Sequence, residues 1–353
     1  MKRPEHILVI RLSAPGDVAM TIPVLHSFQK AFPDVRLTIL TSKRLAPLFK
    51  NLDATLFLAE TKTEHRGFAG LIRLFRQLNG LNTATPIDAV ADLHHVLRSR
   101  IIRKLFAIKG IKTAHIDKGR DEKKALTRKE NKILKQLPSA FDRYRNVFLE
   151  LGFDFRYDFT SIFRDAPLPT EKIIRLTGEK KGKWIGMAPF AAYKEKMYPL
   201  EKMAEVIEQI QKQPGLKIIL FGGVDDAERM VQWSAKYNDI VIAAGKLNLE
   251  EELILMSQLD MMVSMDSANM HFASLVNVPV VSVWGATPAF AGFMGWQQGI
   301  ENAVQVELFC RPCSVFGNKP CYRGDHACMK SLSSFSISER VMELLKKLNS
   351  KML

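Results

Sequence analysis

Cysteine is scarce in this sequence, and long hydrophobic runs do not occur. The chain has 353 residues and four cysteines, too few for a disulfide scaffold, so we expect a reducing compartment such as the cytosol. The longest apolar stretches, such as Val278–Trp284, have the length of a strand, whereas a membrane-spanning helix needs about 20 apolar residues. Near the start, Arg11 interrupts the apolar run Ile7–Ile10, and no small-residue cleavage site follows. The sequence therefore predicts neither a signal peptide nor a membrane span.

The sequence also lacks the fingerprints of several common protein classes. The loop Ser13–Asp17 holds a single glycine, so it matches neither the G-x-G-x-x-G of dinucleotide-binding dehydrogenases nor the G-x-x-x-x-G-K of P-loop NTPases. No zinc-finger or RNP-type motif occurs, and aromatic residues are scarce where the chain is most basic. We therefore expect no nucleic acid among the partners.

Positive charge is in excess and is concentrated in one segment. The chain carries 51 Lys and Arg against 37 Asp and Glu, a net charge of +14. The segment Arg98–Lys135 holds fourteen of these cations and four acidic residues, a net charge of +10. A solvated helix face followed by a mobile loop accounts for this pattern, and so does a surface that meets anionic lipid headgroups. Charge alone does not choose between the two interpretations.

Length and hydrophobic patterning predict two α/β domains. At about 100–200 residues per domain, 353 residues correspond to two domains. In the first half we expect strands at His6–Leu12, Arg36–Thr41, Ala54–Leu58 and Ile87–Leu93, and a helix at Val18–Phe32. Short buried strands separated by helical stretches are typical of a parallel sheet.

The second half alternates strands and helices more regularly. The pattern predicts strands at Lys183–Ala188, Leu216–Phe221, Asp239–Ala244, Met261–Met265 and Val278–Trp284. It predicts helices at Pro199–Gln213, Asp226–Tyr237, Leu249–Leu259 (with Asn248 as its cap), Ser267–Val276 and Ser336–Leu348. This order is that of a doubly wound sheet. We expect domains over 1–167 and 168–335, followed by a C-terminal helix over 336–353.

Polar residues follow several predicted strands, at the edge where open α/β sheets bind ligands. Asp17 follows the first strand and either caps the next helix or acts as a general base. Lys194 and Lys196 precede a predicted helix, where lysines neutralise a phosphate or stand exposed in a loop. Glu228, shortly after the turn Gly222-Gly223, accepts ribose hydroxyls or is an ordinary acidic residue at the start of a helix.

The loop after the strand Met261–Met265 is the most informative. Asp266 ends the strand, while Ser267, Asn269 and His271 open the following helix. Four polar groups at this edge indicate a ligand that carries hydroxyls and phosphates, although helix capping accounts for Ser267 and Asn269 equally well.

The four cysteines cluster near the end of the chain, at Cys310, Cys313, Cys321 and Cys328. Their spacing resembles that of the ligands of a structural zinc ion. Reduced thiols that shape a loop account for the same spacing, and we favour that interpretation. We expect no catalytic metal and no bound cofactor.

Several separate motifs coincide in one order along the chain. In the first half they are Ile7–Ser13, Gly16-Asp17 and Leu25, and in the second half Lys196–Pro199, Phe221–Gly223, Glu228, Met265–Ser267, His271 and Pro279–Pro288. Together they resemble glycosyltransferase family 9, the ADP-heptose:lipopolysaccharide heptosyltransferases, from about residue 6 to residue 345. The chain departs from the family at Ala268, where Gly is frequent, and at Phe190–Ala192, where Thr or Ser is frequent; both departures bear on the identity of the donor.

The resemblance implies a GT-B fold, in which two Rossmann-like, doubly wound parallel-sheet domains face a central cleft. The N-terminal domain binds the acceptor in such a fold, and the C-terminal domain binds the nucleotide sugar. The resemblance makes Asp17 the general base and places Ser13 and Gly16 at the acceptor. The donor-binding residues that it implies are Lys196 at the phosphates, Glu228 at the ribose, Asp266 at the sugar, and Ser267 and His271 beside the diphosphate.

We therefore expect an inverting, metal-independent glycosyltransferase that moves heptose from ADP-heptose onto a lipopolysaccharide core or lipid A-type acceptor. Its partners would be the nucleotide-sugar donor and an anionic glycolipid, and its location cytoplasmic, peripheral at the inner membrane. Two alternatives are a nucleotide-sugar epimerase or hydrolase of the same architecture and a noncatalytic nucleotide-sugar-binding homologue. The joint presence of Asp17, Lys196 and Asp266 argues against a loss of activity.

Overall fold

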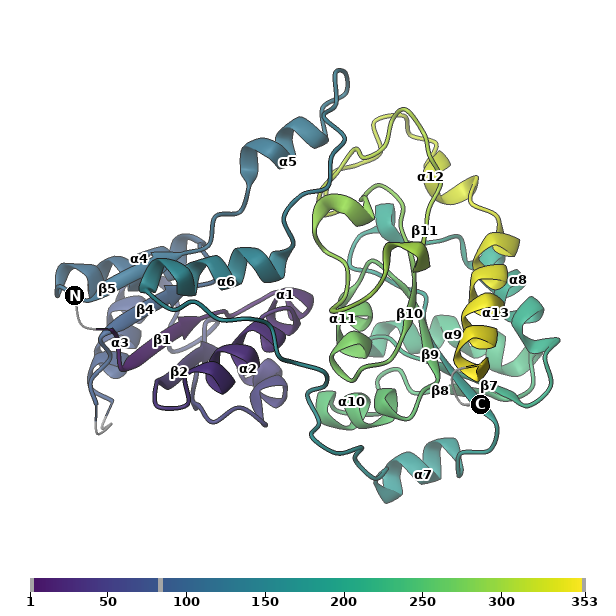
Figure 1. Cartoon of the computed structure of the whole chain (residues 1–353). Coiled ribbons are helices and arrows are strands. Elements are labelled where there is room, and N and C mark those ends of the chain that lie inside the picture. Colours follow the sequence, from purple (N-terminus) through teal and green to yellow (C-terminus); the bar gives the residue numbers. More distant parts are fainter. Residues whose placement is uncertain (1–2, 82–84, 351–353) are drawn as a thin grey trace. The chain divides into compact units, whose positions relative to one another are not determined.

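The chain folds into two compact units. The structure, a computed structural model, describes residues 3–81 and 85–350 (Figure 1). One unit consists of Met1–Lys118 and Pro138–Ile162, and the other of Gly119–Leu137 and Phe163–Leu353. Each is built around its own parallel sheet. None of the described helices combines the length and the apolar character that crossing a membrane requires.

The sheet of the first unit has five strands in the order β3-β2-β1-β4-β5. They are β1 (His6–Ile10), β2 (Arg36–Thr41), β3 (Thr55–Leu58), β4 (Ala89–Asp92) and β5 (Lys112–His115). All residues of the central strand β1 are buried, as expected for a parallel strand that is covered on both faces.

Helices pack on both faces of this sheet. They are α1 (Pro15–Ala19), α2 (Ile22–Ala31), the 3-10 helix η1 (Lys43–Phe49), α3 (Gly67–Asn79), α4 (Leu97–Ile108) and α6 (Ala140–Leu151). Leu74 of α3 and Ile102 of α4 join one buried cluster with Leu8 of β1. In a separate contact, Phe28 of α2 meets Phe148 of α6, with ring centroids 4.7 Å apart.

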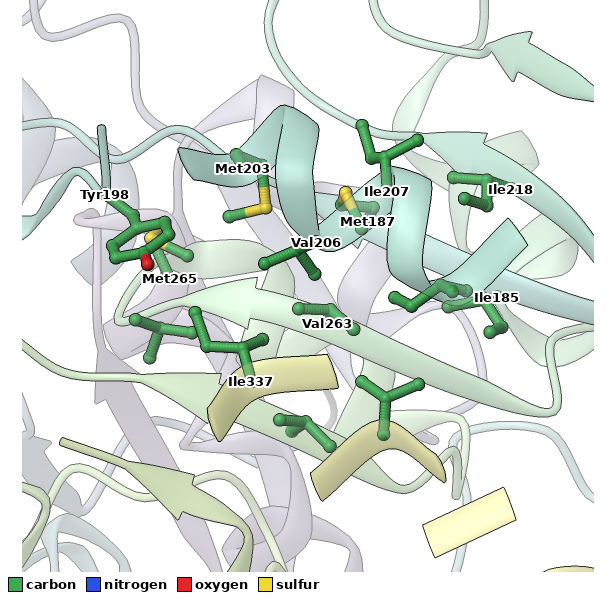
Figure 2. Packing of buried hydrophobic residues seen from close by; sticks show 14 of the residues in the cluster. Ile185, Met187, Tyr198, Met203, Val206, Ile207, Ile218, Val263, Met265 and Ile337 are labelled. Carbon is green, nitrogen blue, oxygen red and sulfur yellow. The ribbon is translucent and has the colours of Figure 1, made fainter. Parts of the chain in front are cut away.

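The second unit has a six-stranded sheet in the order β11-β10-β9-β6-β7-β8. Its strands are β6 (Lys183–Ala188), β7 (Leu216–Leu220), β8 (Ile240–Ile242), β9 (Met261–Met265), β10 (Val280–Val283) and β11 (Ala303–Val304). Its helices are α5 (Arg120–Leu126), α7 (Glu171–Thr177), η2 (Lys194–Lys196), α8 (Leu200–Gln211), α9 (Val224–Lys236), α10 (Leu249–Ser257), α11 (Ala268–Leu275), η3 (Ala289–Ala291), η4 (Ile300–Asn302), α12 (Ala327–Lys330) and α13 (Ser334–Ser350). Figure 2 shows Met203 and Val206 of α8 packing with Val263 of β9 and Ile337 of α13 in its core.

The strand order of each sheet reverses direction at one place. In the first unit the chain proceeds outward from β1 through β2 to β3 and then returns to place β4 on the other side of β1. In the second unit the same reversal separates β6 from β9. Ligands of open α/β sheets bind at the carboxyl edge beside such a switch point. The loops that follow β1, β4, β6 and β9 are therefore the places to look for a site.

Most strands predicted from the sequence are confirmed, and Arg36–Thr41, Lys183–Ala188 and Met261–Met265 have the predicted bounds. The single helix predicted at Val18–Phe32 is wrong, because the chain forms α1 and α2 with a break between them. Thr21 occupies the break and its hydroxyl donates to the Val18 carbonyl, while Pro23 lies in the first turn of α2, where its missing N–H costs nothing. Asn248 caps α10 as predicted, accepting from the Glu251 N–H at 3.0 Å.

The basic segment Arg98–Lys135 does not belong to one unit. Residues 98–118 lie in the first unit, but residues 119–137 group with the second. The interpretation as a mobile loop, one of the two left open, does not hold for Arg120–Leu126, since α5 forms there and Lys123 is buried with its ammonium 4.7 Å from the Phe293 ring centroid. Lys132 donates to the Cys310 carbonyl at 2.8 Å and to the Pro312 carbonyl at 2.5 Å. The range 1–167 expected for the acceptor-binding domain would place the whole +10 segment in the first half, whereas residues 119–137 group with the second unit.

Candidate active site

Asp17 lies in the loop region after β1, within the short helix α1. Its carboxylate Oδ2 is 2.6 Å from Nη2 of Arg11, and its side chain remains 35% exposed. Ala14, not Asp17, occupies the N-cap position of α1. The interpretation of Asp17 as a simple N-cap is therefore wrong; Asp17 is the third residue of the helix, and it accepts only a long bond of 3.4 Å from the Ala14 N–H.

Arg11 is buried and is held from several sides. Its Nη1 donates to the Leu93 carbonyl at 2.6 Å, and its guanidinium lies 5.7 Å from the centroid of the Tyr144 ring. The Tyr144 hydroxyl in turn donates to the backbone carbonyl of Asp17 at 3.3 Å. Burial raises the pKa of Tyr144 above its usual value, so this hydroxyl keeps its proton. Arg11 therefore presents a fixed cation to one oxygen of Asp17.

His94 is the neighbour of this pair that the sequence did not reveal. Its Nε2 lies 3.4 Å from the Ser13 hydroxyl, and its buried Nδ1 has no hydrogen-bond partner among the residues that the structure describes. Burial, followed by the charges of Arg11 and Lys118, lowers the pKa of His94 to about 3, so the ring is neutral at physiological pH. His94 lies two residues after β4 and directly after the strand predicted at Ile87–Leu93, so applying the strand-end rule to that strand would have found it.

The turn that carries His94 is fixed by Asp92, the last residue of β4. The buried carboxylate of Asp92 accepts from the backbone N–H of His94 at 3.1 Å and of His95 at 2.8 Å. Ser13, Asp17 and His94 thus meet at the carboxyl edge of β1 and β4, beside the switch point of the first sheet. Gly16 lies next to Asp17 in α1.

The second unit brings Lys196 and Asp266 together at its own switch point. Lys196 ends η2 after β6, Asp266 follows β9, and the Lys196 Nζ is 2.9 Å from Asp266 Oδ2. The hydroxyl of Thr287, in the loop after β10, donates to the same oxygen at 2.7 Å. Asp266 and Thr287 are buried, whereas Lys194 is exposed. Of the two lysines considered from the sequence, only Lys196 is thus placed with the acid.

Ser267 and His271 lie beside Asp266 in and before α11. Ser267 occupies the N-cap position but makes no capping bond with its side chain; its hydroxyl lies 3.2 Å from that of Ser264. Capping therefore does not account for Ser267. His271 is buried one turn further along the helix. The helix begins at the edge where Asp266 and Lys196 meet.

Glu228 stands apart from the lysine–aspartate pair. It is exposed on α9, which follows β7, the neighbour of β6. Asp226 of the same helix is used locally, since its carboxylate accepts from the Gly223 N–H at 2.8 Å. The acidic residues of this turn thus divide into a capping group, Asp226, and an exposed group, Glu228, at the same edge of the sheet.

The cysteine-containing segment Cys310–Cys328 forms a wall of the Lys196 site. Gly317 lies against the Lys196 side chain. Arg311 is buried and donates to the Gly285 carbonyl at 2.6 Å and to the Thr287 carbonyl at 3.1 Å, which fixes the loop after β10. These contacts join residues that are far apart in the chain, and no sequence motif indicated them.

The cysteines themselves carry no disulfide. Cys310 and Cys328 are buried and all four thiols are free. Within the part of the chain that the structure describes, no group of three or more His, Cys, Asp or Glu residues is arranged to hold a metal ion. Structural zinc at this segment stays a hypothesis to be decided by metal analysis of the purified protein.

Each Rossmann-like sheet carries charged groups at its switch point, a carboxylate in the first unit and a lysine–aspartate pair in the second. Residues 71–319 match the model of glycosyltransferase family 9 (heptosyltransferase). The match covers most of the chain, and the protein belongs to glycosyltransferase family 9.

Relatives of known name agree with this assignment. The chain is 23% identical over 296 residues to lipopolysaccharide heptosyltransferase 1 of Campylobacter coli, which covers 80% of this chain and 85% of the relative. Its fold is similar to that of a family 9 glycosyltransferase from Veillonella parvula, with a TM-score of 0.74, 22% identity and 97% of each chain covered. It is also similar to ADP-heptose LPS heptosyltransferase II of E. coli, with a TM-score of 0.69, 18% identity, and 99% and 100% coverage. The predicted family, the fold class and the glycosyltransferase class are confirmed.

Proposed function

We propose that this protein is an inverting, metal-independent heptosyltransferase. Its donor would be ADP-heptose, and its acceptor a lipopolysaccharide core or lipid A-type glycolipid at a membrane surface. The family and the names of the relatives support the sugar and the acceptor class. The observation that carries the proposal is the partly exposed Asp17 carboxylate, which is bound by Arg11 through one oxygen.

Asp17 is assigned the removal of the acceptor proton. Arg11 and the Ala14 N–H engage Oδ2, so Oδ1 is the oxygen to which we assign the proton. The acceptor oxygen attacks the anomeric carbon from the face opposite the diphosphate, the bond from that carbon to the phosphate oxygen breaks, and ADP departs with the electron pair. Displacement from the opposite face inverts the anomeric centre. Ser13 and Gly16, next to Asp17 in sequence, are assigned to the acceptor.

Lys196 is assigned to the departing diphosphate, which gains negative charge as the bond breaks. Asp266 holds the Lys196 ammonium in place and is also assigned to the sugar. Ser267, with a hydroxyl that is not used for capping, and His271 are assigned to the diphosphate oxygens beside the first N–H groups of α11. Glu228, exposed at the same edge, is assigned to the ribose hydroxyls.

The test is a transfer assay with ADP-heptose and a heptose-deficient lipopolysaccharide acceptor, comparing Asp17→Asn with the wild type. The variant keeps the side-chain shape but removes the base, so we expect a loss of about 10²–10⁴-fold in kcat with unchanged ADP affinity. If Asp17→Asn turns over at the wild-type rate and binds ADP as the wild type does, Asp17 is not the general base.

The same assay separates the two alternatives. An epimerase or hydrolase converts ADP-heptose when no acceptor is present, whereas the proposed transferase releases ADP only with acceptor. A noncatalytic homologue binds ADP-heptose and releases ADP under neither condition. Analysis of the anomeric configuration of the product tests inversion, and activity in excess chelator tests metal independence.

A further inference from the structure

A stripe of exposed residues runs the length of α4. Leu97, Arg100, Lys104 and Ile108 are spaced so that they lie on one side of the helix. All four are exposed, Leu97 to 75% and Ile108 to 82%. The opposite side, with Ile102 fully buried, packs in the core. Two large aliphatic side chains therefore face solvent with two cations between them.

Helix α3 extends this face, because the two helices pack against each other (Figure 1). The Phe75 ring of α3 meets the Phe106 ring of α4 at 5.0 Å between centroids, and Lys109, just after α4, donates to Asn79 at the end of α3 at 2.8 Å. Since later residues of α3 meet later residues of α4, the helices run in the same direction, and their first turns lie at the same end.

The combined face is rich in positive charge, and one acidic residue, Glu64, lies just before α3, where its carboxylate accepts from Gln77 Nε2 at 2.8 Å. Neither α3 nor α4 contains an acidic residue, and α3 adds the exposed Arg73 and Arg76 and, near its start, Phe68 with 70% exposure. The two acids that lie between the helices in the chain, Asp88 and Asp92, are engaged by backbone N–H groups, and Asp92 is buried. Asp88 accepts from backbone N–H groups at the start of β1, and Asp92 accepts from the turn after β4.

This face begins beside the acceptor side of the candidate active site. Helices that follow parallel strands start at the carboxyl edge of the sheet. The turn from Asp92 to Leu97 contains His94, which lies next to Ser13. The exposed Leu97 thus lies three residues after His94, which is part of the candidate site.

We propose that the outer face of α3 and α4, defined by Phe68, Leu97, Arg100, Lys104 and Ile108, docks on an anionic lipid bilayer. The inference rests on the proposed function in one respect, that the acceptor is a glycolipid. Cations near an anionic leaflet are attracted to its headgroups, and burial of apolar surface among the acyl chains adds to the binding. A face with both kinds of group fits the boundary between headgroups and acyl chains.

Residues 119–137 are the obvious rival, because they also carry cations and the exposed Ile133 and Leu134. Two of their cations are already used within the second unit, Lys123 against the Phe293 ring and Lys132 on backbone carbonyls. Acidic residues also occur among them, whereas α3 and α4 have none. We therefore assign the lipid contact to α3 and α4.

The experiment measures co-sedimentation of the full-length protein with vesicles of phosphatidylethanolamine and phosphatidylglycerol. Arg100→Gln/Lys104→Gln removes two cations and is expected to weaken binding about 30-fold. Leu97→Gln/Ile108→Gln removes the apolar groups and is expected to weaken it by about tenfold or more. The matched controls, Arg120→Gln/Lys124→Gln and Ile133→Gln/Leu134→Gln, make the same changes at exposed positions of residues 119–137 and are expected to bind like the wild type.

Wild-type vesicle binding by both α4 variants, or loss of binding in the controls instead, overturns the proposal. If the α4 variants change only the oligomeric state in light scattering, the face is a protein interface and the proposal is also overturned. Transfer to a deacylated, water-soluble acceptor is measured in parallel and is expected to stay at the wild-type level in all four variants. Absence of transfer in the wild-type protein would count against the proposed function, and vesicle binding would still test the docking face.

Discussion

Gly317 lies over the aliphatic chain of Lys196, so closely that a Cβ atom at position 317 would stand 2.4 Å from Lys196 Cγ and Cδ. The backbone of Gly317 also has φ of +74°, a conformation that favours glycine. The cysteine-containing segment thus fixes the path of the lysine that we assign to the diphosphate.

Gly317→Ala should therefore weaken ADP binding, because the new methyl group displaces Lys196 from Asp266. We expect an increase of about tenfold in the Kd of ADP by calorimetry, and a loss of stability of about 1–2 kcal/mol from the backbone conformation alone. Gly324→Ala is the matched control, since Gly324 has φ of +77° and open space around its Cβ position. Equal ADP affinities in the two variants would contradict this role of Gly317.

Thr287→Val tests the hydroxyl that donates to Asp266. The change keeps the shape of the buried side chain but removes the 2.7 Å hydrogen bond, so the Asp266 carboxylate loses the Thr287 donor and keeps Lys196. Hydrogen bonds to charged groups contribute about 1.5–3 kcal/mol, and we expect the Kd of ADP-heptose to rise about tenfold or more. Thr287→Ser retains the donor and should bind nearly as the wild type does; similar losses in both variants would show that the methyl group, not the hydroxyl, matters.

Arg11→Lys tests how Asp17 is held. A lysine keeps the charge but lacks the planar fork that reaches both the Leu93 carbonyl and the Asp17 carboxylate. We expect kcat for transfer to fall about 10²-fold, with the Kd of ADP-heptose unchanged. Steady-state kinetics with varied acceptor, combined with donor titration, separates the two effects. Wild-type kcat in Arg11→Lys would mean that the guanidinium does not position the base.

His94 should make the first unit less stable in acid. The pKa of His94 is lowered to about 3 in the folded protein from an ordinary value of 6.5. Between these values the unfolded chain binds a proton that the folded protein does not, so stability falls as the pH decreases, by up to about 1.4 kcal/mol per pH unit. The loss of stability begins below pH 6.5 and reaches its full size near pH 3.

His94→Gln should remove this part of the pH dependence. We expect the wild type to lose about 1.5 kcal/mol more than the variant between pH 6.5 and pH 5, measured by urea unfolding at each pH. His95 and His115, whose pKa values are also lowered by burial, remain in both proteins and cancel in the comparison. Parallel stability curves for the two proteins would show that His94 is not held neutral by the fold.

Strands that are buried on both faces could be predicted from the sequence, whereas a half-exposed strand could not. Met261–Met265 is an apolar run interrupted only by Ser264 because the strand is covered on both faces, and its bounds were predicted correctly. The edge strand Lys112–His115 was missed because it is half-exposed and has no such run. Helix Gly67–Asn79 was missed although its buried residues Leu71, Leu74 and Leu78 have helical spacing.

The sequence by itself determined which polar residues stand at the ends of buried strands. Asp17, Lys196 and Asp266 were found in this way, because the carboxyl edge of a parallel sheet gathers the loops that follow its strands. Only the tertiary structure decided what these residues contact. Arg11 on Asp17, Thr287 on Asp266 and Gly317 against Lys196 depend on packing between segments distant in the chain. A local pattern records burial and periodicity. The partner of a side chain is set by strand order and by the path of the loops, and a local pattern does not specify either.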